Sequence, residues 1–193
     1  FCVVWGVICI PFLAAGFFSI KNTLKNNRKS LTILAMAGAF IFVISSLKIP
    51  SVTGSCSHMT GTGLGALLFG PASVSILGII VLLFQAILLA HGGLTTLGAN
   101  CFSMAIAGPF VSFGVYKLCL KLKVNKLVAV FLAAALGDII TYGVTAAQLA
   151  LAHPSESGGV GASMAKIMAV FAPTQLPRAI LEDIETVVVI IGR

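Results

Sequence analysis

Six long apolar runs constrain what this chain can fold into, because each is close to the length that an α-helix needs to cross a lipid bilayer. Such a helix needs about 20 apolar residues at about 1.5 Å rise each. Only 9% of the 193 residues are charged, whereas soluble domains carry about 25%. We therefore expect an all-α integral membrane protein, a single transmembrane domain over residues 1–193. The runs are Phe1–Ile20, Leu31–Leu47, Ala72–Ala90, Thr95–Tyr116, Leu127–Ala150 and Ala165–Ile191.

Basic residues cluster in two gaps between these runs, at 21–29 and 117–126. The net charge of +7 does not indicate nucleic-acid binding, because nothing else in the sequence fits a basic binding patch. Clusters of this kind mark cytoplasmic loops of a multi-pass protein in the cell membrane. Two cytoplasmic loops must be separated by an even number of crossings, but the obvious runs between them number three. A further crossing is therefore expected.

The candidate for this crossing is Thr60–Gly70, read TGTGLGALLFG. It is too short to span about 30 Å of hydrocarbon alone. We expect it to be entered from a buried loop at about 48–59, because irregular backbone at membrane depth must be surrounded by protein or a water-filled cavity. The prediction is a bundle of about seven transmembrane helices, with the N-terminus outside and the C-terminus in the cytoplasm. The chain as given starts inside an apolar run, so we expect an N-terminal piece to precede it.

The densest polar stretch, Lys48–Gly65, holds Cys56, Ser57, His58 and Met59 side by side. Imidazole and sulfur ligands suit transition metals such as nickel, cobalt, copper and zinc. The alternative is a polar external loop whose glycines serve turns and helix packing. A buried loop with ionisable groups is usually functional, which favours metal binding.

A second stretch, AHGGLTTLGANCFSMAIAGP (Ala90–Pro109), contains His91 and Asn100. His91 ends a long apolar run, where an interfacial histidine can be structurally idle. The predicted topology places His91 on the same side as His58, so both histidines and Asn100 can face one pocket. The five cysteines are an odd number lying mostly in apolar runs, and they indicate core residues and not a disulfide framework.

Acidic residues interrupt the last two runs. Asp138 lies in the fifth run, and Glu182, Asp183 and Glu185 lie in the sixth. We expect these carboxylates to face the bundle interior or to pair with Arg178. Three carboxylates within four residues cannot all face inward on one helix. At least one should therefore reach water or a headgroup, and the last run is expected to break near Pro177.

The motifs of common energy-using and hydrolytic sites are absent from the sequence. It contains no GxxxxGK[ST] phosphate loop, no HExxH and no GxSxG. A transporter with this sequence must therefore take its energy from an ion gradient or from a partner. A gradient-driven carrier predicts paired intramembrane carboxylates in corresponding positions of two repeats, and no such repeat is seen.

The runs LKIPSVTGSCSHMTGTGLGALLFGP (Leu47–Pro71) and LLFQAILLAHGGLTTLGANCFSMAIAGP (Leu82–Pro109) closely resemble the CbiM family. This family forms the substrate-capture component of cobalt transporters of the energy-coupling-factor type, and NikM is its nickel relative. The segment TQLPRAILE (Thr174–Glu182) is similar to the same family. The resemblance covers nearly the whole chain.

The resemblance implies a non-enzymatic transporter subunit that captures divalent cobalt externally and supplies it for cobalamin biosynthesis. Nickel capture is the alternative, and a gradient-driven metal carrier is a more distant one. The implied partners are a transmembrane coupling subunit, ATP-binding-cassette ATPase subunits and a small accessory membrane subunit. ATP would then be hydrolysed outside this chain.

The resemblance also implies a metal-ligand set. In the family, the N-terminal amine and a histidine at the second position of a Met-His-Ile-type start bind the metal. A loop histidine that matches His58 completes the set. The residues themselves, and not the resemblance, add Cys56, Ser57, His91 and Asn100 as candidates for the surrounding pocket. The Met-His start is not in the sequence as given, so we expect the chain as written to bind metal weakly or not at all. Asp183 and Glu185 replace the glycine and apolar residues usual in the family.

Overall fold

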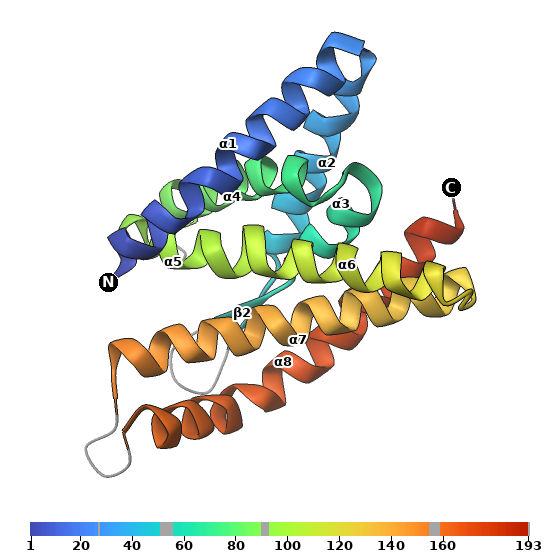
Figure 1. Ribbon diagram of the computed structural model, residues 1–193. Helices are drawn as coiled ribbons and strands as arrows, with labels where there is room; N and C mark the ends of the chain where they lie inside the picture. The colour runs from blue at the N-terminus through green and yellow to red at the C-terminus, as the bar shows by residue number, and fades with distance from the viewer. Residues whose placement is uncertain (27, 51–55, 90–92, 155–158, 193) are drawn as a thin grey trace.

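The computed structural model describes residues 1–26, 28–50, 56–89, 93–154 and 159–192; of residues 26, 48–50 and 56–58 it describes the backbone alone. Within these residues the chain forms seven continuous helical segments and one short ribbon of two strands (Figure 1). The helices are α1 (Cys2–Asn26), α2 (Lys29–Ser46), α3 (Thr62–Phe69), α4 (Pro71–Leu88), a continuous segment that ends in α6 (Gly108–Lys121), α7 (Lys126–Ala152) and α8 (Gly159–Ile191).

The segment that ends in α6 changes its helical type along its length. It begins with the 3₁₀ turn η1 (Leu94–Thr96) and continues through α5 (Leu97–Asn100). The next seven residues, η2 (Cys101–Ala107), form a π-helix before α6 begins. The predicted crossing Thr95–Tyr116 is therefore present as one helix, but its π-helical middle was not predicted.

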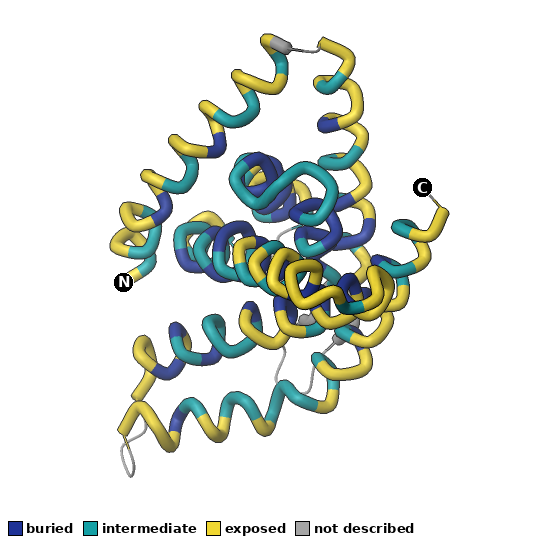
Figure 2. Tube along the Cα trace, turned by 45° about the vertical axis from the view of Figure 1, so that its right-hand side comes forward, coloured by how far each residue is buried: buried dark blue, intermediate teal, exposed yellow. Residues whose placement is uncertain are grey.

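Five of the helical segments in the described residues are long and apolar enough to cross a membrane. They correspond to the first five apolar runs of the sequence. Their apolar side chains remain exposed on the outside of the bundle, as Val3, Phe18, Met36 and Leu88 show. Figure 2 shows the exposed residues on the outer faces and the buried ones toward the centre. Such helices suit a lipid environment, in which apolar side chains need no cover.

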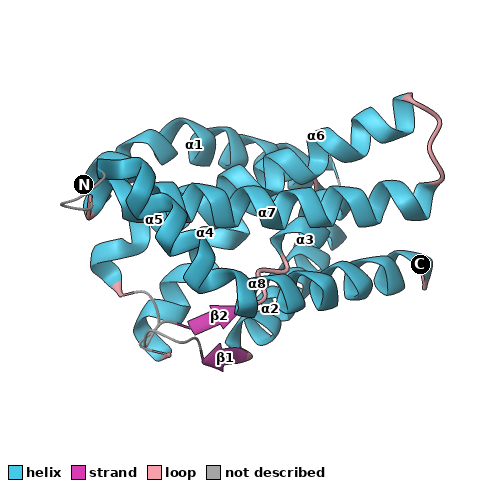
Figure 3. Ribbon diagram, turned by 90° about the horizontal axis from the view of Figure 1, so that it is seen from below, coloured by secondary structure: helices cyan, strands magenta, loops and turns pink. Residues whose placement is uncertain are grey.

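The short helix predicted after residue 59 is α3, whose eight residues end just before Pro71. The segment that leads into it is not wholly irregular. Strands β1 (Lys48–Pro50) and β2 (Cys56–His58) pair antiparallel, with Lys48 opposite His58. Figure 3 shows this ribbon beside α2 and α8. Strand pairing satisfies backbone groups that an irregular loop would leave exposed.

The prediction that the last run breaks near Pro177 is wrong, because α8 runs through both Pro173 and Pro177. A proline removes one helical hydrogen bond, but neighbouring side chains in a bundle can satisfy the freed groups. In α8, the Thr174 hydroxyl donates to the carbonyl of Phe171. The Tyr142 hydroxyl, on α7, donates to the carbonyl of Met168. Neither acceptor is the carbonyl four residues before a proline, so these bonds hold the turns beside Pro173 and do not replace the hydrogen bonds that the prolines remove.

The two chain ends lie at opposite ends of the bundle. Figures 1 and 3 both show the N-terminus near α5, whereas the C-terminus lies at the end where α6 turns into α7. The N-terminal end of α1 packs closely on α5 through a glycine. A Cβ at Gly98 would lie 2.3 Å from the carbonyl oxygen of Cys2 and 2.8 Å from the amide nitrogen of Gly6. The absence of a side chain at Gly98 therefore allows the N-terminal end of α1 to lie directly against α5.

Candidate functional site

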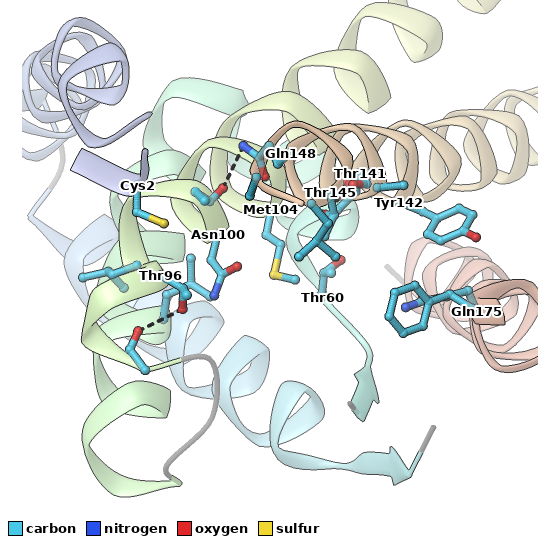
Figure 4. Close-up of a pocket in the computed structure, with 18 of the residues that line it drawn as sticks. Cys2, Thr60, Thr96, Asn100, Met104, Thr141, Tyr142, Thr145, Gln148 and Gln175 are labelled. Carbon is cyan, nitrogen blue, oxygen red and sulfur yellow. Dashed lines mark hydrogen bonds between the residues drawn. The ribbon is translucent and has the colours of Figure 1, made fainter. Parts of the chain in front are cut away.

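A cavity of about 570 Å³ opens among the N-terminal end of α1, the α5–η2 segment, α4, α7 and α8. This volume lies in the range of small-molecule sites, about 300–1,000 Å³. Figure 4 shows Asn100, Met104 and Gln175, from α5, η2 and α8, around the same space. The polar side chains in its lining include Thr60, Gln85, Thr96, Asn100, Gln148, Gln175 and Arg178.

A buried carboxylate holds the segment that enters this cavity from the β1–β2 ribbon. Glu182 Oε2 accepts a hydrogen bond from the backbone N–H of Thr60 at 2.9 Å. Its Oε1 accepts from the Thr60 hydroxyl and from the backbone N–H of Gly61, both at 2.7 Å. Because α8 supplies the acceptor and the residues before α3 supply the donors, Glu182 ties the two segments together.

These hydrogen bonds also cap the short helix. Gly61 is the residue that precedes α3, with a φ of 62° that favours glycine. The first N–H groups of a helix have no partner within it, and a negative charge is favourable there. Glu182 supplies both the acceptor and the charge. It is only 4% exposed, so water does not compete for these donors.

Arg178 lies beside Glu182 and joins α7 to the same cluster. Its Nη1 lies 3.5 Å from Glu182 Oε2, the i, i+4 pair predicted from the sequence. Its Nη2 lies 3.8 Å from Asp138 Oδ2 on α7. All three side chains are buried. The expectation that Asp138 pairs with Arg178 inside the bundle is thus confirmed.

The other two carboxylates of α8 differ in exposure. Asp183 is 2% exposed, whereas Glu185 is half-buried. Two adjacent carboxylates, those of Glu182 and Asp183, therefore both lie inside the protein. The residue predicted to reach out of the bundle corresponds best to Glu185.

The π-helix η2 connects the cavity to its neighbours through its carbonyl groups. The Thr62 hydroxyl, on α3, donates to the carbonyl of Met104 at 3.1 Å. One turn earlier, Gln148 Nε2 on α7 donates to the carbonyl of Ala99 at 3.3 Å. Single π-turns occur frequently at functional sites. Here the π-helix presents Met104, and the preceding turn presents Asn100, to the cavity.

The comparison with known families agrees with this fold. The family model described as "CbiM: Cobalt uptake substrate-specific transmembrane region" matches residues 1–191. The chain belongs to the CbiM family. It is thus a multi-pass transport component of the membrane and not an enzyme, as predicted.

Two curated relatives have the name Cobalt transport protein CbiM. The protein from Lachnoclostridium phytofermentans is 74% identical over 192 residues, which cover 100% of this chain and 77% of the relative. The protein from Chlorobium limicola is 64% identical over 185 residues, which cover 96% of this chain and 73% of the relative. The resemblance found in the sequence motifs therefore extends over the whole chain.

Two solved structures share the fold. A crystal structure of a transition metal transporter is 30% identical, with a TM-score of 0.83 over 99% of this chain and 86% of that one. A structure of a truncated transition metal transporter is 28% identical, with a TM-score of 0.81 over 98% of this chain and 91% of that one. The seven-helix arrangement is therefore a transition metal transporter fold.

His58 is the metal ligand predicted from the sequence resemblance, and the structure describes its position only in part. The backbone of Cys56, Ser57 and His58 forms β2, while their side chains lie outside what is described. His91 lies entirely outside the described residues. Asn100 lines the cavity, and so does Thr60, two residues after His58. Of the pocket predicted from the sequence, the structure therefore places Asn100 and the residue two positions after His58 at one cavity. That His58 binds the metal stays a prediction.

Several cavity residues were not predicted from the sequence. The Glu182–Thr60 contact joins residues 122 positions apart, which no local pattern reveals. Gln85 and Gln148 did carry a signal, since each is the one amide side chain in its long, mostly apolar run. A polar side chain inside a membrane span usually faces the interior and has a function.

Proposed function

We propose that this CbiM-family chain captures divalent cobalt at the external side of the cell membrane. It would act as the substrate-binding subunit of an ATP-driven energy-coupling-factor transporter that supplies cobalamin biosynthesis. The observation that carries the proposal is that the N-terminal end of α1 and the segment just after His58 line the same cavity. Phe1 and Cys2 line it, and Glu182 fixes Thr60, two residues from His58, in its wall.

This convergence matters because of the ligand set that the family resemblance implies. Two nitrogen donors come from the family's Met-His start and a third comes from the histidine that matches His58. Ligands so far apart in the sequence must be brought to one place by the fold. Nitrogen donors favour square-planar or tetragonal sites for late transition metals and disfavour magnesium and calcium. The metal is the cargo of this site.

The proposed orientation places the N-terminus outside and the C-terminus inside. The C-terminus and the Lys-rich turn between α6 and α7 lie at one end of the bundle (Figures 1 and 3), which agrees with the preference of basic loops for the cytoplasm. Single-cysteine replacements at Lys25 and Lys123 should react with an impermeant thiol reagent from the cytoplasmic face. Labelling of the two positions from opposite faces would contradict this orientation.

The proposed partners are a transmembrane coupling subunit, ATP-binding-cassette ATPase subunits and a small accessory membrane subunit. The sequence has no phosphate loop of its own, so the energy would come from those ATPases. The test is uptake of radioactive cobalt and nickel by cells that carry the full-length gene, with and without the ATPase subunits. Cobalt uptake that requires the ATPases supports the proposal.

The same experiment separates the alternatives. Uptake that is indifferent to the ATPases would indicate a gradient-driven carrier and overturn the energy-coupling proposal. ATPase-dependent uptake of nickel in preference to cobalt would indicate nickel capture, since both metals accept the same nitrogen donors.

A further inference from the structure

Gln85 on α4 is a buried amide without a hydrogen-bond partner. Its side chain is 1% exposed, and neither Oε1 nor Nε2 has a partner among the described residues. A buried polar group without a partner is costly, and such groups are rare in folded proteins. The Thr62 hydroxyl donates to the carbonyl of Met104, and Gln148 Nε2 donates to the carbonyl of Ala99, so neither of these donors is directed at Gln85. Gln85 is therefore available to something that enters from outside the protein.

The place of Gln85 shows where that ligand would lie. Gln85 lines the large cavity and also a small pocket that adjoins it. Thr60, Leu82 and Met104 line both spaces as well, whereas Ser45, Thr62 and Gly78 line only the small one. Gln85 thus stands at the inner wall of the large cavity. Asn100 lines the large cavity from α5, and Figure 4 shows it among the lining residues together with Met104.

We infer that Gln85 and Asn100 form an inner binding position that holds the divalent cation together with the water molecules still bound to it. This inference rests on the proposed function. It concerns the passage of the cation through the cavity while the nitrogen ligands do not coordinate it. Water bound to a cation presents O–H donors, and the side-chain oxygens of Gln and Asn accept such bonds. The position is therefore an outer contact, distinct from direct coordination.

The size and charge of the cavity fit this ligand. The cavity of about 570 Å³ leaves room for a cation with six water molecules, which occupies about 180 Å³ at about 30 Å³ per water. Its described lining contains no carboxylate. Arg178 also lines it, but its guanidinium lies near Glu182 and Asp138. Neutral oxygen acceptors bind a hydrated cation weakly, which lets it leave again, as a transport pathway requires.

The test compares Gln85→Leu with the matched variant Gln175→Leu, which changes the same residue type in the same cavity. Equilibrium cobalt affinity is measured on the purified full-length protein, and the initial rate of uptake is measured in cells that also carry the partner subunits. We expect Gln85→Leu to keep the affinity within about twofold but to lower uptake at saturating cobalt about tenfold, because it removes a hydrogen bond to a charged ligand. Gln175→Leu should change both less than about twofold.

The melting temperature of Gln85→Leu shows whether a loss of uptake arises from a loss of folding. Leucine removes an unpaired buried amide, so Gln85→Leu should melt at or above the wild-type temperature; if it fails to fold, Gln85→Met takes its place in both assays. Wild-type uptake by the folded variant would overturn the inference and leave Gln85 as a merely hydrated amide. A parallel fall in affinity and uptake would also overturn it, because Gln85 would then belong to the capture site. If the wild-type protein takes up no cobalt, the proposed function fails instead.

Discussion

Glu182 and Thr60, 122 residues apart in the sequence, meet inside the protein through two hydrogen bonds of 2.9 and 2.7 Å. Glu182 adds a third bond to the N–H of Gly61. One side chain of α8 thereby fixes the point where the β1–β2 ribbon ends and α3 begins. Since His58 lies two residues before Thr60, the position of the predicted metal ligand depends on a residue of the last helix.

Replacement of Glu182 by glutamine should therefore weaken cobalt binding while largely preserving the fold. A glutamine keeps the size of the side chain but has only one acceptor oxygen. The donors of Thr60 and Gly61 bind both carboxylate oxygens of Glu182. Loss of one bond to a charged group costs about 1.5–3 kcal/mol, which is about tenfold or more in affinity when the segment must be ordered for binding. Isothermal titration of cobalt into the purified full-length protein measures this loss.

Glu185→Gln is the control for that variant, because it makes the same change on α8 at a half-buried position. We expect its cobalt affinity to equal that of the wild type. If Glu182→Gln also bound cobalt with wild-type affinity, the carboxylate would have no part in positioning the His58 segment.

The hydroxyl of Thr60 offers a smaller perturbation of the same contact. Thr60→Val keeps the shape of the side chain and both backbone hydrogen bonds but removes the donor to Glu182 Oε1. It leaves a buried carboxylate oxygen with one donor fewer, which lowers the free energy of unfolding by about 1–3 kcal/mol. The melting temperature in detergent should fall, and Thr60→Ser should restore it in large part. A Thr60→Val protein as stable as the wild type would contradict the strength assigned to this bond.

Gly98 tests whether the packing of α1 on α5 matters for capture. An added Cβ in Gly98→Ala would lie 2.3 Å from the carbonyl oxygen of Cys2, so α1 must move away. Overpacking of this kind costs about 1–3 kcal/mol, and it displaces the N-terminal end from the cavity. We expect lower stability and weaker cobalt binding, measured by thermal unfolding and titration.

Gly143→Ala is the matched control for Gly98→Ala, since nothing lies within 4 Å of a Cβ at Gly143. It should bind cobalt as the wild type does. Equal affinities for Gly98→Ala and the wild type would show that the close approach of α1 to α5 is not needed for capture.

The fold was largely predictable because lipid imposes simple length and charge rules on a helix. The positions of α1, α2, α4 and α7 follow from their apolar runs, and α3 follows from the count of crossings between two basic gaps. The continuity of α8 through Pro177 could not be predicted, because a proline inside a helical run can either end the helix or be tolerated within a packed bundle. The π-helix at Cys101–Ala107 has no sequence signature that separates it from an α-helix.

The candidate site was predictable only where a polar or charged residue lies inside a membrane-spanning run, because such residues usually face the interior of the bundle. The i, i+4 pair of Arg178 and Glu182 follows from helical spacing, and Asn100 follows from its motif. The partner of Glu182 across the bundle could not be read from the sequence, because contacts over 122 residues depend on how helices pack. Gln85 is visible as a lone amide, but its lack of a partner is a property of the folded protein.

The most direct test of the account is equilibrium binding of radioactive cobalt to the full-length protein and to His58→Ala. His153→Ala is the control, since His153 also lines the cavity but does not match the family's ligand. We predict saturable binding by the wild type and by His153→Ala. Loss of one metal-binding nitrogen from His58→Ala should weaken binding about tenfold to 100-fold or more, by analogy with the cost of removing residues that only support such ligands. Unchanged cobalt affinity in His58→Ala would contradict the account.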